Sequence, residues 1–228
     1  MPPDRSQPPL NPLPWIVWAL VLPIVAMEVT LAAGQAGLAG GPEAIGWRLD
    51  ALQRFAFVPD LARQAMATGQ GWGAVLARAL TYPVVHGGFT AALFAVVLTL
   101  ALGKMVAEVF RPWAVLAVVF GSSVAGAFAY ALVPGATAAL AGASPAVYGL
   151  VGAFTWVLWV RLAGTGSRQY QAFALIGVLL AVQLLFGVLF GTGWDWVADV
   201  AGFAAGFALS FVVAPGGWRR LVARLRQR

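Results

Sequence analysis

Ser144 is the residue best placed for chemistry, because it stands where a loop of small residues, 134–141, meets the apolar run 145–160. A serine followed by a proline is typical of a helix start, with Ser144 as N-cap and Pro145 in the first turn. Tyr148 is four residues further on and would share a helix face with Ser144. The serine is therefore either a helix cap or a nucleophile, and a nucleophile needs a base within hydrogen-bond reach.

The composition places these residues in a membrane protein. Of the 228 residues, 61% are hydrophobic and 10% are charged, and the mean hydropathy is +0.85. A soluble domain of this length could not bury so much apolar surface. The chain has no cysteine and one histidine, His86, so neither a thiolate site nor a histidine-rich metal site can form, and we expect no metal and no cofactor.

The hydropathy pattern predicts an all-α polytopic protein with six spans, at residues 15–33, 82–103, 112–133, 145–161, 172–190 and 196–214. We expect a disordered tail at 1–14, one membrane domain at 15–214 and a basic tail at 215–228. A cleaved signal peptide ending near Ala33 is the rival interpretation of the first span. The fourth span is the shortest, which would leave a water-accessible hollow above it.

The segment 34–79 is too charged to cross a membrane. Its arginines and aspartates alternate with tryptophan, leucine and phenylalanine, a mixture that predicts short amphipathic helices lying in the interface. Near the end of the preceding span, Glu28 is expected to reach the lipid headgroups.

The basic residues predict the orientation. Six spans put both termini on one side of the membrane. Ten basic residues lie in the tails and in the turns after spans two and four, whereas the loops after spans three and five have none. The positive-inside rule therefore places both termini in the cytoplasm. The basic C-terminal tail is interpreted as an orienting or headgroup-binding segment, with no role in nucleic-acid binding. The abundance of Ala, Gly, Arg and Val suggests a bacterial inner membrane.

Several short motifs occur in a fixed order along this pattern. The Gly202–Gly206 spacing lets the last span touch a neighbour backbone to backbone. In order and spacing, residues 47–213 resemble the rhomboid family of intramembrane serine proteases. The pieces that carry the resemblance are Phe57-Val58-Pro59, Thr81-Tyr82, His86-Gly87-Gly88, Gly121 with Gly126, Gly142-Ala143-Ser144, Tyr148-Gly149, and Ala198 with Gly202 and Gly206.

The resemblance implies a six-helix fold with a long interfacial first loop and a Ser–His dyad that cleaves substrates in or near their transmembrane segments. Ser144 takes the nucleophile position and Tyr148 the position that packs on the dyad. The dyad histidine, however, is replaced by Asp199. The two side-chain donors that support the oxyanion in the family are replaced by Ala91 and Ala95, and the glycine after the nucleophile is Pro145.

Two residues remain open as substitutes for the missing base. Asp199 is either a base, since an aspartate in an apolar environment can act near neutral pH, or a polar packing contact between helices. His86 is either a structural histidine that bonds to the backbone of the first loop or a rescue base for Ser144.

Three functions follow from these alternatives. The first is a rhomboid without proteolytic activity, a pseudoprotease, which binds transmembrane helices of client proteins through the gate between helices two and five. The second is an active intramembrane serine protease that uses Ser144 with an unusual base. The third, a small transporter, has little support, because Asp199 and Glu28 are the only charges well inside spans. The partners expected are client transmembrane helices and the lipid bilayer.

Overall fold

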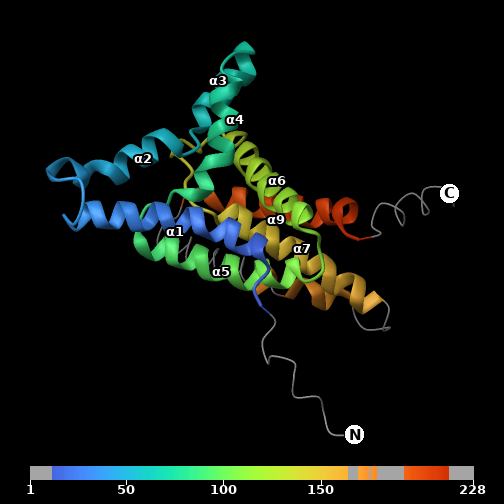
Figure 1. Cartoon of the computed structure of the whole chain (residues 1–228). Helices are drawn as coiled ribbons and strands as arrows, with labels where there is room; N and C mark the ends of the chain where they lie inside the picture. Colours follow the sequence, from blue (N-terminus) through green and yellow to red (C-terminus); the bar gives the residue numbers. More distant parts are fainter. Residues whose placement is uncertain (1–11, 164–168, 175, 179–192, 216–228) are drawn as a thin grey trace, which may run out of the picture.

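The computed structural model describes residues 12–163, 169–174, 176–178 and 193–215, and this part of the chain is helical (Figure 1). Five of its helices are long and apolar enough to cross a membrane: α1 Trp15–Gln35, α5 Phe89–Ala107, α6 Pro112–Ala131, α7 Ser144–Ala163 and α9 Asp195–Val213. An all-α polytopic membrane fold is therefore confirmed. The predicted fifth span, 172–190, and both predicted tails lie largely outside the described residues. The 3-10 helix η3, Gln169–Phe173, reaches only the first two residues of the predicted fifth span.

Helices α6, α7 and α9 form the tightly packed centre of the molecule. A Cβ atom added to Gly206 on α9 would overlap the backbone of Gly149 on α7, and one added to Gly202 would overlap Pro145. On α6, a Cβ at Gly126 would lie 2.8 Å from the carbonyl oxygen of Ala198. These glycines bring the three backbones into contact, so the predicted close approach of the last span is present and positions the start of α7 against α9.

Helix α5 begins later than the sequence pattern predicts. The span was expected from residue 82, but residues Tyr82–Val84 form the 3-10 helix η2 and the α-helix starts only at Phe89. Pro83 and the pair Gly87-Gly88 explain the delay, because proline lacks the N–H that a helix interior needs and glycine is a poor helix former. His86 consequently lies in the segment before the helix.

Helix α7 is not shorter than its neighbours, which corrects a second expectation. It has 20 residues, against 19 in α5 and 19 in α9. It starts at Ser144 itself and continues past Arg161 to Ala163. A hollow above Ser144 therefore cannot be inferred from a short helix.

The segment between α1 and α5 folds as short helices, as predicted. They are η1 Pro42–Gly46, α2 Trp47–Phe55, α3 Pro59–Thr68 and α4 Trp72–Thr81. Figure 1 shows α2 beside the far end of α1, while α3 and α4 extend away from the bundle. Phe57, Tyr82 and Tyr130 are fully buried in a cluster between these helices and α6. The first loop is thus a structured element packed on the membrane helices.

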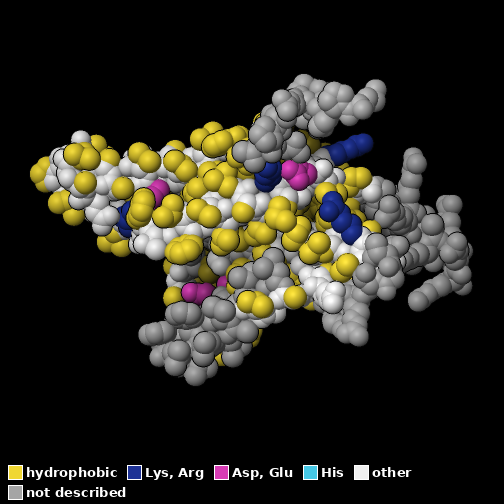
Figure 2. Space-filling model, turned by 90° about the horizontal axis from the view of Figure 1, so that it is seen from below, with side chains coloured by type: hydrophobic (Ala, Val, Ile, Leu, Met, Phe, Trp, Pro, Cys, Tyr) yellow, Lys and Arg dark blue, Asp and Glu magenta, His cyan; other side chains and the backbone are white. Residues whose placement is uncertain are grey.

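The outer surface of the bundle is apolar. Figure 2 shows hydrophobic side chains spread over most of the visible described surface, with few charged groups among them. Large apolar side chains with high exposure include Leu22, Val29, Phe94 and Val97. Such a surface is unstable in water and suited to lipid.

Candidate active site

Ser144 begins α7 at the end of a sharp turn. Gly142 has φ +100°, a conformation that favours glycine, and the N–H of Val147 donates to the Ala143 carbonyl across the first helical turn at 2.9 Å. The residues flanking Ser144, namely Ala143 and Pro145, are buried, whereas Ser144 is exposed. The chain therefore presents one accessible hydroxyl at the mouth of a buried helix.

Asp199 lies beside this hydroxyl. It stands in the second turn of α9, is 3% exposed, and its Oδ1 accepts a hydrogen bond from Ser144 Oγ at 2.7 Å. The close packing of Gly202 on Pro145 explains the proximity, because it leaves no space for side chains between the two helices. The structure thus brings together the serine and the acid that the sequence predicted at the position of the family's histidine, 55 residues apart in sequence.

Tyr148 lies one turn after Ser144 on α7 and is partly buried against the core formed by α5, α6 and α7. The four-residue spacing places it on the Ser144 face of the helix. This position suits packing beside the serine–aspartate pair.

His86 is occupied by the backbone that precedes Ser144. Its Nε2 accepts a hydrogen bond from the Ala143 N–H at 3.2 Å, and the residue is 3% exposed. Burial lowers the pKa of His86, and the backbone at Val84 offsets this shift in part. A nitrogen lone pair that accepts from Ala143 cannot also take the Ser144 proton. The geometry therefore favours the structural role, in which the ring is held by Ala143 in the loop before Ser144 and by the Val84 backbone that precedes α5.

An ion pair that the sequence did not reveal supports His86. Arg48 on α2 donates to both carboxylate oxygens of Glu28 on α1, at 2.6 and 3.0 Å, and to the His86 carbonyl at 2.9 Å. The two side chains are 12% and 8% exposed. Glu28 was expected to reach the headgroups, and this is wrong: a bidentate arginine keeps it inside the protein. Sequence spacing could not pair residues on two separate helices.

The loop 134–143 is fixed by the first loop along its length. Leu140 and Phe57 exchange backbone hydrogen bonds of 2.8 and 2.9 Å, and the Gly142 N–H donates to the Tyr82 carbonyl at 3.0 Å. Arg63 donates to the carbonyls of Ala131, Val133 and Ala136. These bonds hold the backbone that leads into Ser144.

The positions for stabilising an oxyanion are poor in donors. Ala91 and Ala95 lie one turn apart on α5, and neither side chain can donate. The Ala143 N–H is bonded to His86, and Pro145 has no N–H. The Ser144 N–H remains as the backbone donor nearest to the hydroxyl.

The described residues hold no group of three His, Cys, Asp or Glu side chains that could bind a metal ion. The side chains that meet at this site supply a serine hydroxyl and a carboxylate.

Together these features define a helical polytopic membrane protein with a serine at a helix mouth, hydrogen-bonded to an acid on the last helix. The Rhomboid domain family model matches residues 73–216, more than half of the chain. The chain belongs to the rhomboid family. No match was found among the curated proteins.

Proposed function

We propose that this rhomboid-family protein binds transmembrane helices of client proteins and hydrolyses peptide bonds slowly or not at all. The observation that carries this proposal is the 2.7 Å hydrogen bond from Ser144 Oγ to a carboxylate in the position of the family's histidine. In their unperturbed forms an imidazole is a stronger base than a carboxylate, and the family relies on the imidazole to withdraw the serine proton.

The scarcity of oxyanion donors supports the same conclusion. Removing one such donor typically lowers kcat by about 10²–10³. Here two side-chain donors are absent at Ala91 and Ala95, and Pro145 and His86 remove two backbone N–H groups from use. The tetrahedral intermediate of peptide hydrolysis would form with little stabilisation, while the helix-packing scaffold around it is intact.

The alternative function is an active intramembrane serine protease with Asp199 as base. One observation favours it. The Ser144 hydroxyl is exposed, and its distance to Asp199 Oδ1 falls within the range of about 2.6–3.2 Å expected between a nucleophile and its base. This alternative predicts that cleavage depends on both Ser144 and Asp199.

Binding and cleavage can be measured in one experiment. The purified protein with a donor dye and a single-span model peptide with an acceptor dye are reconstituted in liposomes. We expect saturable energy transfer that is equal for the wild type and Ser144→Ala, with no peptide product. Energy transfer no greater than with an unrelated helical membrane protein would contradict the proposal, and a product that disappears in Ser144→Ala would favour the protease.

We further propose that both termini lie in the cytoplasm of a bacterium, with the loop 134–143 outside the inner membrane. The distribution of basic residues supports this orientation. Single cysteines at Ser6 and Gln227 should react with an impermeant maleimide only after the cells are opened. Labelling of either cysteine in intact cells would reverse the orientation.

A further inference from the structure

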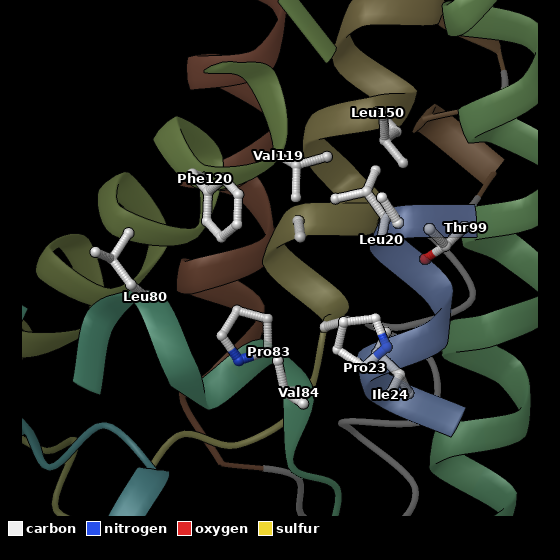
Figure 3. A pocket seen from close by; sticks show the side chains of 13 residues that line it. Leu20, Pro23, Ile24, Leu80, Pro83, Val84, Thr99, Val119, Phe120 and Leu150 are labelled. Carbon is white, nitrogen blue, oxygen red and sulfur yellow. The ribbon is translucent and has the colours of Figure 1, made fainter. Parts of the chain in front are cut away.

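An apolar crevice lies between α1 and α6, beside the start of α7 (Figure 3). Its volume is about 80 Å³. Leu20 and Pro23 of α1 form one wall and Phe120 of α6 the opposite wall. Ala143, which precedes α7, and Ala146 in its first turn also line the crevice. Ser144 is not part of the lining.

The crevice opens toward the lipid. Leu80 of α4 and Phe120, which flank it, are 43% and 40% exposed, and Pro23 is exposed as well. Both α1 and α6 are candidate membrane spans, and the residues that they contribute to the lining, Leu20, Pro23 and Phe120 among them, fall well inside these spans. Leu80 of α4 and Pro83 and Val84 of η2 line the crevice from the first-loop side. The mouth therefore lies at the depth of the hydrocarbon, where water is not available to fill it.

Two hydrogen-bonding groups interrupt this apolar lining. Thr99 of α5 is 5% exposed, and Figure 3 shows its oxygen turned toward the other lining side chains. Within the described part of the chain, its hydroxyl makes no hydrogen bond. On α1, Pro23 has no N–H to donate to the carbonyl of Ala19, which also lines the crevice.

We infer that the crevice receives one polar side chain of a client transmembrane helix, such as a serine or threonine near the middle of its span. A lipid chain would fill the space but could not hydrogen-bond to the Thr99 hydroxyl or to the Ala19 carbonyl, and an unpaired polar group is costly in hydrocarbon. A hydroxyl can donate to the Ala19 carbonyl and accept from Thr99. The small residues Ala19, Ala143 and Ala146 allow the close backbone approach that helix pairs in membranes use.

This inference rests on the proposed function and adds a second contact surface to it. A client held here touches the buried side of the Ala143–Ala146 turn, whereas the Ser144 hydroxyl is not in the crevice. The crevice therefore recognises a helix without presenting its backbone to the serine.

The test uses two synthetic single-span Leu–Ala peptides that differ only in one central residue, serine or leucine. Their affinities for the purified protein in liposomes are measured by energy transfer. We expect the serine peptide to bind the wild type about three- to tenfold more tightly, as is typical of a hydrogen bond between helices in a membrane. Thr99→Val, which keeps the side-chain shape, should abolish this preference.

Thr155→Val is the matched control, because Thr155 of α7 is fully buried, its hydroxyl has no partner among the described residues and it does not line the crevice. It should retain the preference. If both peptides bind equally well to the wild type, or if Thr99→Val keeps the preference, the crevice inference is wrong while the proposed function stands. If neither peptide binds, both are wrong.

A photoreactive residue in place of Phe120 locates the contact. It should crosslink the serine peptide, whereas the same residue in place of Phe94, on the exposed face of α5, reports binding at the α5 surface. Crosslinks from position 120 to phospholipid that the serine peptide does not reduce would identify a lipid chain as the occupant and overturn the inference.

Discussion

Replacing Asp199 with histidine is expected to supply the base of the family's dyad but not its oxyanion donors. The substitution places an imidazole where a carboxylate oxygen now lies 2.7 Å from Ser144 Oγ. Assistance by a positioned general base contributes about 10²–10⁴ to the rate. Each missing oxyanion donor costs about 10²–10³, and the donors at Ala91 and Ala95 remain absent. We therefore expect cleavage by Asp199→His to stay close to the detection limit.

The triple variant Ala91→His, Ala95→Asn, Asp199→His should cleave far faster than the separate gains predict, because members of one catalytic unit do not act additively. Pro145 limits the gain, since its ring fixes the backbone after the serine and supplies no N–H. The assay compares wild type, single variant and triple variant on one transmembrane substrate, in detergent and in liposomes. Ser144→Ala in the triple background is the control and should abolish the gain. If Asp199→His alone matched the triple variant, the oxyanion reasoning would be refuted.

Three further predictions concern the scaffold that holds the site. Gly206→Ala should lower the free energy of unfolding in detergent by about 1–3 kcal/mol or more, because the new Cβ meets the Gly149 backbone. Gly73→Ala is the control and should leave the free energy of unfolding unchanged, because a Cβ there meets nothing within 4 Å. Equal effects of the two substitutions would contradict the packing. Arg48→Leu should lower the free energy of unfolding by about 3–5 kcal/mol, because it leaves Glu28 buried without its partner. Adding Glu28→Leu should recover much of this stability. If it recovers none, the broken ion pair is not the cause of the loss. Burial lowers the pKa of His86, so the unfolded chain takes up the proton first and stability should fall as the pH drops below about 6.5. His86→Gln should flatten that dependence, and an unchanged profile would assign it to another group.

The sequence predicted much of the fold because its signals were local. Apolar stretches closed by Pro and Gly located four of the five described membrane helices to within two residues, the exception being α5. There the run continued back to residue 82, but Pro83 and the two glycines before Phe89 prevented helix. A hydropathy pattern does not detect such helix breaks, so the helix predicted from it wrongly included His86.

The site could be predicted only in part, because its remaining contacts join residues far apart in sequence. The motif order suggested that Ser144 and position 199 correspond to a dyad, and the structure places their side chains in contact. Nothing in the spacing indicated that Arg48 would bind Glu28 and the His86 carbonyl, or that His86 would bind Ala143. Those bonds depend on how α2 lies across α1, which hydropathy does not determine.

The most direct test of the central claim is cleavage of a model transmembrane substrate by the wild-type protein in liposomes, beside an active rhomboid protease and Ser144→Ala. We predict that the wild type and Ser144→Ala give the same background and that a fluorophosphonate labels Ser144 far more slowly than the active enzyme's serine. Cleavage or labelling at a rate comparable with that of the active rhomboid, and lost in Ser144→Ala, would contradict the account and establish the Ser144–Asp199 pair as a working catalytic site.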